Sequence, residues 1–249
     1  MKKMTTNLKV LIDSIPTNEN IFFHCRLKGL ESNKNNHNLL SKKIIRLLCD
    51  RKPKSIIIPT YTYSFTKNFV FDQSLSVSET GRFSEEIRKM AGSSLRTLDP
   101  IFSHVLLQNS NFLDEKISTR SFGNRTIFHK FVQAKGVIVN FNLKDITTPL
   151  FHFLEYKFNV PYRKNKIFCG DVINKNKSKI KVKYNFFCRK KNSLITIDRK
   201  KILKDLKKNN IVFEKKNKKN SLLWFYSDKF IKFLSKKLKN NPNYLIKIN

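Results

Sequence analysis

A run of three isoleucines sets the strongest constraint on the fold of this chain. Ile56, Ile57 and Ile58 stand between Ser55 and Pro59, with no polar residue among them to face solvent. A strand exposed on one face alternates apolar and polar residues, so this run predicts a central strand that is covered on both faces. Such strands are typical of parallel sheets between helices. Pro59 is expected to end the strand, because proline cannot donate to a sheet ladder.

Apolar periodicity elsewhere in the chain fits the same architecture. Short apolar runs predict strands at 19–24 and 136–141, and residues 96–107 are predicted to form a turn that enters another strand. Apolar residues at helical spacing predict helices at 37–50 and 82–90. A last helix is predicted to start at Ser227 and Asp228, with Phe230, Ile231, Leu234 and Leu238 on one face. We expect an α/β fold with a mixed, largely parallel central sheet flanked by helices.

The isoleucine strand is predicted to lead into a long loop over residues 60–81. This loop begins with hydroxyl and aromatic side chains, Thr60-Tyr61-Thr62-Tyr63, and contains the carboxylates of Asp72 and Glu79. Long loops beyond the carboxyl end of a strand commonly carry function, so we expect this one to contact a ligand.

The chain is strongly basic, with a net charge of +33 from 51 Lys and Arg against 18 Asp and Glu. Residues 171–249 hold 24 of the basic residues, and we expect them to form a smaller basic α+β portion that completes the same domain as residues 1–170. The sequence is also rich in Asn, Ile and Phe, as an AT-rich coding bias would give, which weakens the case for a polyanion partner. A nucleic-acid-binding protein using the basic C-terminal part remains the alternative class.

No apolar run approaches the roughly 20 residues that a membrane helix needs, and the N-terminus lacks the apolar region of a signal peptide. We therefore expect no membrane insertion and a cytoplasmic location. Cys25, Cys49, Cys169 and Cys188 are scattered without a CxxC pair, which favours free thiols over disulfides or a zinc site. No metal is expected.

A strand, a short loop and a helix bring a histidine and a glutamate together near the middle of the chain. Thr148 and Pro149 predict a helix start after the strand at 136–141, which places His152 in the first turn and Glu155 three residues later. This spacing puts the imidazole and the carboxylate on one helix face, as for a general base and the group that orients it. A partly exposed helical pair without a function has the same spacing, and the pattern alone does not separate the two.

Five segments within residues 20–170 resemble, in order, motifs of the aminoglycoside 3-N-acetyltransferase family. The first is His24 with Leu27, which matches a His-x-Ser-Leu turn, and the second is residues 57–63 with Phe71 and Asp72, which match a strand-Pro-Thr-aromatic-Thr stretch. The third and fourth are Gly81 to Arg88, which match Gly-x-Phe/Leu-x-Glu-x-x-Arg, and Arg96 to Ser103, which match Arg-Ser-x-His-Pro-x-x-Ser. The fifth is Thr147 to Glu155, which matches Asn-Thr-x-x-His-x-x-Glu. The chain departs from these motifs at Arg26 instead of serine, at Asp99 instead of histidine, and at 140–142 instead of a glycine-rich strand end.

The resemblance implies an acetyl-CoA-dependent N-acyltransferase core over residues 1–170, with direct transfer in a ternary complex. It implies His152 as general base with Glu155 as its orienter. For acetyl-CoA it implies contacts with His24, Cys25, Arg26, Leu27, Lys28, Gly29, Thr60, Thr62, Ser103 and Val105. For the acceptor we expect Tyr61, Asp72 and Glu79, with Glu155 as a further carboxylate able to meet a cationic amino sugar. The oxyanion site is left open between backbone amides beyond Ser103 and the hydroxyls of Thr60 and Thr62.

We expect the acceptor to be an amino group on a sugar. The basic composition favours a nucleotide-linked amino sugar used in surface polysaccharide synthesis, because its phosphates complement a lysine-rich protein. An aminoglycoside, and so a role in antibiotic resistance, is the alternative acceptor.

Overall fold

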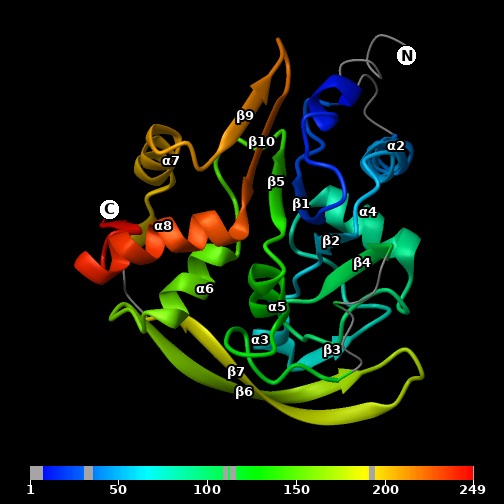
Figure 1. The fold of residues 1–249 in the computed structure, drawn as a ribbon. Helices are drawn as coiled ribbons and strands as arrows, with labels where there is room; N and C mark the ends of the chain where they lie inside the picture. The colour runs from blue at the N-terminus through cyan, green and yellow to red at the C-terminus, as the bar shows by residue number, and fades with distance from the viewer. Residues whose placement is uncertain (1–7, 31–35, 109–111, 113–115, 191–193, 249) are drawn as a thin grey trace.

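The computed structural model describes residues 8–30, 36–108, 112, 116–190 and 194–248. A six-stranded sheet forms its centre, in the order β4-β2-β1-β5-β10-β9 (Figure 1). Its strands are β4 (His104–Gln108), β2 (Ser55–Pro59), β1 (Asn20–Cys25), β5 (Val137–Phe141), β10 (Ser221–Tyr226) and β9 (Phe213–Lys216). The middle strands β2, β1 and β5 are parallel, and β4, β10 and β9 add to them in antiparallel pairs. The predicted α/β fold with a mixed sheet is confirmed.

The isoleucine run forms the doubly covered strand that its sequence predicts. Strand β2 is buried at all five positions and pairs with β1 on one side and β4 on the other. Ile57 packs in one hydrophobic core, while Ile56 and Ile58 pack in the core on the opposite face. The alternation of side chains along a strand thus gives both faces an apolar layer.

Helices cover both faces of the sheet (Figure 1). On one face, α2 (His37–Cys49) and α4 (Arg82–Ala91) bury apolar side chains, as do residues 8–12. On the other face lie α5 (Ile127–Gln133), α6 (Leu150–Lys157), α7 (Arg199–Lys208) and α8 (Ser227–Asn240). The apolar stripe predicted for the last helix is buried, at Phe230, Ile231, Leu234 and Leu238.

A long hairpin lies beyond the carboxyl ends of the central strands (Figure 1). It is formed by β6 (Arg163–Ile173) and β7 (Lys179–Arg189), and β3 (Val70–Asp72) adds a third strand parallel to β6. The prediction of a long loop over 60–81 was wrong here, because α3 (Phe65–Asn68) and β3 lie within it. The sequence could not show β3, since its three residues become a strand only through pairing with the distant β6.

The basic C-terminal part contributes β10 to the central sheet, where it pairs along β5. It also contains β7 and β9, and two short strands, β8 (Ile195–Ile197) and β11 (Ile246–Ile248), that pair with each other. All four cysteines are free thiols, as predicted. In the part of the chain that the structure describes, no helix is long and apolar enough to span a membrane.

A fully buried arginine fixes the loop that follows the isoleucine strand. Arg96 donates to the backbone oxygens of Thr60 (3.0 Å) and Ser76 (2.6 Å) and to the hydroxyl of Ser103 (3.1 Å). Its guanidinium also lies over the ring of Phe71, at 4.9 Å from the centroid. One side chain therefore joins the end of β2, the 72–80 segment and the start of β4.

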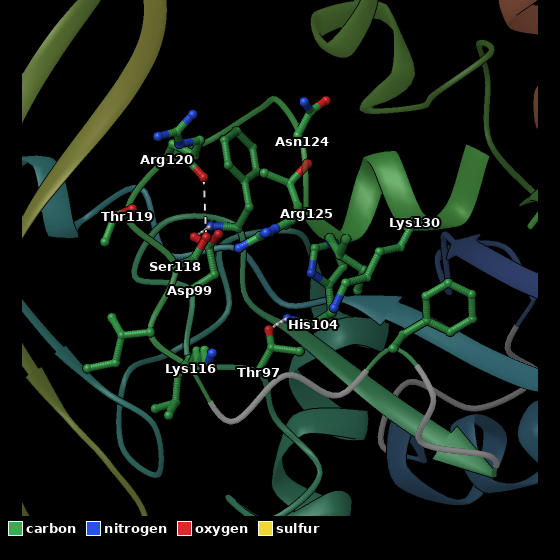
Figure 2. A pocket seen from close by; sticks show the side chains of 16 residues that line it. Thr97, Asp99, His104, Lys116, Ser118, Thr119, Arg120, Asn124, Arg125 and Lys130 are labelled. Atoms are coloured by element: carbon green, nitrogen blue, oxygen red, sulfur yellow. Dashed lines mark hydrogen bonds between the residues drawn. The ribbon is translucent and has the colours of Figure 1, made fainter. Parts of the chain in front are cut away.

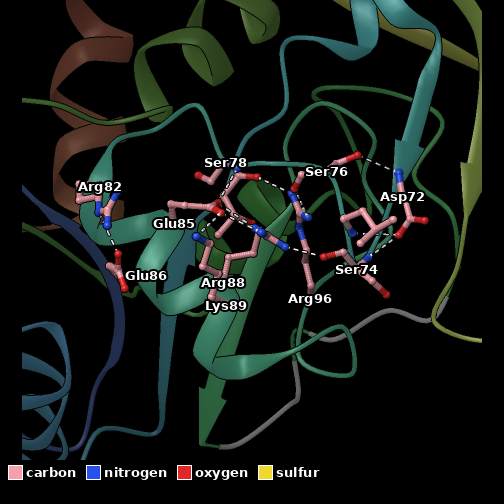
Figure 3. Close-up of polar contacts among 12 residues, drawn as sticks. Asp72, Ser74, Ser76, Ser78, Arg82, Glu85, Glu86, Arg88, Lys89 and Arg96 are labelled. Carbon is pink, nitrogen blue, oxygen red and sulfur yellow. Dashed lines mark hydrogen bonds and ion pairs between the residues drawn. The ribbon is translucent and has the colours of Figure 1, made fainter. Parts of the chain in front are cut away.

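A second arginine ties the same segment to α4 (Figure 3). Arg88 makes two hydrogen bonds of 2.8 Å to the carboxylate of Glu85 and a further one to the backbone oxygen of Ser74. Glu85 also accepts a hydrogen bond from the amide of Ser78. The segment resembling the family's Glu-x-x-Arg motif thus holds the loop in place.

We predict that Arg96→Met lowers the free energy of unfolding by about 3 kcal/mol or more, because it leaves several buried acceptors without a donor. Urea denaturation of the purified protein measures this loss. Arg82→Met is the control, since Arg82 is 58% exposed and its ion pair with Glu86 should contribute less than about 1 kcal/mol. Equal losses in the two variants would contradict the role given to Arg96.

Candidate active site

The candidate site begins where β5 leads into α6. The side chain of Asn140, at the end of β5, accepts a hydrogen bond from the Thr147 amide (2.6 Å) and donates one to the Thr147 carbonyl (2.8 Å). Thr148 then accepts the amide of Leu150 through its hydroxyl, at 3.2 Å, as predicted for a residue at a helix start. Pro149 lies one position earlier than predicted, just before the first helical residue. These contacts fix the entry of the helix that carries His152.

His152, Glu155 and Arg163 form a close group. His152 Nδ1 lies 2.6 Å from Glu155 Oε2, and the same oxygen forms an ion pair with Arg163 Nε at 2.6 Å. We assign the imidazole proton to Nδ1, which donates to the carboxylate and leaves the lone pair on Nε2. Arg163 Nη2 also lies 2.8 Å from Nδ1; since a guanidinium can only donate, this contact is a close approach of two donors in the assigned tautomer and not a hydrogen bond. The side chain of Glu155 is 1% exposed, whereas that of His152 is 31% exposed and can meet a ligand.

The surroundings of His152 keep it neutral. Burial lowers the pKa of His152, and the charges of Arg163 and Arg199 lower it further, while Glu155 opposes the shift. Burial acts to raise the pKa of Glu155, but the hydrogen bond from His152 and the charge of Arg163 bring it below its usual value. A neutral imidazole beside an ionised carboxylate is the state that a general base requires.

His152 borders a cavity of about 390 Å³. Aromatic rings form much of its wall, and three further lining residues come from the hairpin: Arg163, Cys188 and Arg189. The aromatic residues are Tyr63, Phe102, Phe122 and Phe186. We call this space the His152 cavity.

A second cavity, of about 430 Å³, shares Phe102 with the His152 cavity as a lining residue. Figure 2 shows the side chains that line it. Four cationic side chains line it, and we call it the basic cavity: they are Lys116, Arg120, Arg125 and Lys130. His104 also lines it and is fully buried, with no hydrogen bond to either ring nitrogen from the described residues. Burial, with the nearby His24, lowers the pKa of His104 to about 3 although the Phe102 backbone opposes the shift, so this ring is neutral.

A sequence model of the aminoglycoside 3-N-acetyltransferase family matches residues 53–239. The chain belongs to this family. It is therefore an acetyl-CoA-dependent N-acetyltransferase, and the resemblance inferred from five segments is confirmed. No curated protein matches the sequence.

Solved structures of similar fold cover nearly the whole acetyltransferase. Aminoglycoside acetyltransferase AAC(3)-Xa has a TM-score of 0.74 at 14% identity, over 98% of this chain and 93% of that one. AAC-IIIb in a binary complex with CoASH has a TM-score of 0.73 at 13% identity, over 95% and 96%. The YokD protein of Bacillus subtilis has a TM-score of 0.72 at 14% identity, over 96% and 99%. At these identities the likeness concerns the fold.

Two predicted site residues of the acetyltransferase lie in an aromatic cluster near the cavities. The ring of His24 stacks on Phe22 at 5.1 Å, and burial lowers the pKa of His24 to about 3. The ring of Tyr61 lies 4.9 Å from Phe102 and 5.2 Å from His104. Both side chains are largely buried and come together at the carboxyl ends of β1 and β2.

The hydroxyls predicted near the thioester are engaged in local structure. Thr60 Oγ1 lies 3.1 Å from Ser103 Oγ, and Thr62 Oγ1 donates to the Pro100 carbonyl at 2.7 Å. Val105 lies in β4 with its side chain in the hydrophobic core. These residues shape the 99–103 turn, and their hydroxyls are less suited to an oxyanion than the sequence alone indicated.

The turn predicted to meet acetyl-CoA follows β1. The side-chain amide of Asn142 donates to the carbonyls of Arg26 and Lys28, at 3.0 Å each, from a backbone with a φ of 56°. Asparagine tolerates this left-handed conformation, which explains how the turn forms without the family's glycine-rich strand end. Burial raises the pKa of the Cys25 thiol, which disfavours an acyl-cysteine route. Leu27 is buried, and Gly29 has a φ of 88°.

Asp72 and Glu79, two of the predicted acceptor carboxylates, do not line the His152 cavity. Asp72 caps its own turn by accepting the amides of Ser74 and Leu75. Glu79 accepts the amide of Ser64 at 2.6 Å. Both carboxylates are thus held by backbone amides of the 60–81 segment.

Sequence reasoning missed Asn140, Arg163 and Arg189. Asn140 stood out only as a departure from a glycine-rich pattern, and the two arginines reach the site because β6 and β7 fold over it. No periodicity or spacing could have indicated that approach. Among the described residues, no group of three or more His, Cys, Asp or Glu side chains could hold a metal ion.

We predict that kcat/KM for acetyl transfer stays high from neutral pH to below pH 6.5. The role expected from the sequence for His152, that of general base, requires its neutral form; because its pKa is lowered, activity should be lost only as the pH falls through that lowered value. Removing the carboxylate in Glu155→Gln should move this acidic limb to still lower pH and reduce the rate. Thermal unfolding would verify that the variant is folded during the assay, and an acidic limb above pH 6.5 would contradict the assignment.

Proposed function

We propose that His152 is the general base of acetyl transfer from acetyl-CoA to an amino group of an amino sugar. The observation that carries this proposal is the 2.6 Å contact between His152 Nδ1 and the buried Glu155 carboxylate, beside a cavity that the imidazole can reach. The contact fixes the ring and stabilises the imidazolium that a base becomes.

Bound acetyl-CoA supplies the acetyl group as a thioester. His152 Nε2 takes a proton from the amine nitrogen as that nitrogen bonds to the carbonyl carbon. When the carbon–sulfur bond breaks, the imidazolium can return the proton to the departing sulfur. Glu155 stays ionised throughout, since Arg163 and His152 both favour its charged form.

The phosphates of acetyl-CoA fit the basic cavity. Arg125 and Arg120 can donate paired hydrogen bonds to phosphate oxygens, and Lys116 and Lys130 add positive charge. His104, buried with its ring nitrogens unbonded, offers a neutral polar contact inside the cavity. The turn at 25–29, predicted from the sequence, remains a second candidate contact for the same molecule.

Family membership favours an aminoglycoside as acceptor over the nucleotide-linked amino sugar expected from the composition. The nucleotide-linked acceptor, and with it a role in surface polysaccharide synthesis, stays a second candidate because two arginines line the His152 cavity. We also propose that residues 171–249 complete one domain with 1–170, which the pairing of β10 with β5 supports. The predicted cytoplasmic location would give such an enzyme access to acetyl-CoA.

We predict that His152→Ala lowers kcat about 10²- to 10⁴-fold, the usual contribution of a general base. Thiol release from acetyl-CoA, measured with sisomicin and with UDP-glucosamine, tests this. His129→Ala is the matched control, because His129 lies on α5 and lines neither cavity. Near-normal turnover by His152→Ala would remove the assignment. Steeply salt-dependent RNA binding without CoA binding would instead favour the nucleic-acid alternative.

We predict that Arg125→Gln raises KM for acetyl-CoA about 10-fold and leaves KM for the acceptor unchanged, because a hydrogen bond to a charged group is lost. Arg26→Gln is the comparison, since Arg26 lies on the turn favoured by the sequence. If Arg26→Gln alone raises KM for acetyl-CoA, the phosphates lie along that turn and the basic cavity is not their site.

A further inference from the structure

We propose that the His152 cavity selects an amine whose scaffold also carries a phosphate, and that Arg189 binds that phosphate. The inference rests on the proposed acetyl transfer and names its acceptor class. A phosphorylated amino sugar, free or nucleotide-linked, has this chemistry. A polycationic aminoglycoside, the acceptor that family membership alone favours, lacks the phosphate, and the charges around this cavity favour the phosphorylated amine over it.

Two guanidinium groups face each other at the open end of the β6–β7 hairpin. Arg163 is directly opposite Arg189 in the antiparallel ladder, and both line the His152 cavity. Like charges in opposite positions of a ladder destabilise a sheet. An anion close to the two guanidinium groups would offset their repulsion, and Glu155 provides a negative charge for Arg163 only.

Arg189 is available to a ligand. It is exposed, whereas the side chain of Arg163 is only 8% exposed and is held by Glu155 and by the Phe187 carbonyl. Across the described residues, no carboxylate forms an ion pair with Arg189. A planar guanidinium with free donors at the edge of a cavity is well suited to two parallel hydrogen bonds to a phosphate.

The carboxylates near the cavity are not suited to a polyamine. None of the lining residues is acidic. Glu155 is buried between His152 and Arg163, and Glu79, which lies close enough to raise the pKa of Tyr63, is bonded to the Ser64 amide. The positive charge of Arg199 also reaches His152. A polycationic acceptor would therefore meet unfavourable charge beside the base.

The aromatic part of the cavity suits the remainder of such an acceptor. The rings of Tyr63 and Phe186 lie 6.1 Å and 5.8 Å from that of Phe102, each in an edge-on arrangement. Together they give the cavity that Arg189 and His152 also line an apolar wall, against which a sugar ring or a base can pack. The amine would then face His152 while the phosphate meets Arg189.

The test compares four acceptors by thiol release from acetyl-CoA: glucosamine, glucosamine 6-phosphate, UDP-glucosamine and sisomicin. We expect at least one phosphorylated amine to have a kcat/KM at least 10-fold above that of glucosamine. Arg189→Gln should raise the KM of that phosphorylated amine about 10-fold with little change in kcat, and should affect glucosamine much less. A preference for UDP-glucosamine over glucosamine 6-phosphate would assign the phosphate to a nucleotide.

Lys183→Gln is the matched control, because it removes one positive charge from the same strand at a residue that lines neither cavity. It should leave every KM unchanged. Sisomicin as the best acceptor, with Arg189→Gln neutral or beneficial, would overturn the proposal. So would an equal loss with all four amines, since that indicates a structural role.

Calorimetry separates failure of this inference from failure of the proposed reaction. UDP-glucosamine and glucosamine 6-phosphate are titrated into the intact protein and into Arg189→Gln. Binding that weakens about 10-fold in the variant supports the phosphate site even if no acceptor is acetylated. Absence of binding to both phosphorylated amines overturns it, even if acetylation of sisomicin shows the enzyme to be active.

Discussion

The proposed site depends on the contacts that the buried carboxylate of Glu155 makes. A carboxylate with 1% exposure loses nearly all of its hydration, and only strong local partners can compensate for that cost. His152 and Arg163 are those partners, and they come from different parts of the fold, helix α6 and strand β6. The contacts that keep Glu155 ionised therefore also orient the imidazole of His152 and hold the β6–β7 hairpin next to the site.

The other segments that resemble motifs of the family have a structural role. Arg96, Glu85 and Arg88 make hydrogen bonds to the backbone of the 60–80 segment, and Ser103 joins Arg96 to Thr60. These residues fix the turn after β2 and the turn before β4, in which Phe102 lines both cavities and Tyr61 packs edge-on against it. These residues make hydrogen bonds to backbone groups that would otherwise lack partners. This structural role explains why they occur in the motifs, without any contact to a substrate.

The charge of the protein has to be judged at two scales. The total of +33 reflects a lysine-rich composition and says little about any one site. The arginines at 163 and 189 differ from that background, because they face each other across a ladder and border a cavity beside a histidine. The positions of these two arginines thus indicate an anion-binding role that the total charge of the protein cannot indicate.

The sequence by itself determined the elements whose signal is local. The isoleucine run specified a doubly covered strand, apolar spacing specified the buried face of α8, and the i, i+3 spacing placed His152 beside Glu155. Only the tertiary structure decided what surrounds that pair. Strand β3 pairs with β6, about a hundred residues later in the chain, and the hairpin so placed brings in Arg163 and Arg189. Periodicity reports how a segment faces its neighbours within a few residues, whereas the register between distant strands follows from packing of the whole chain.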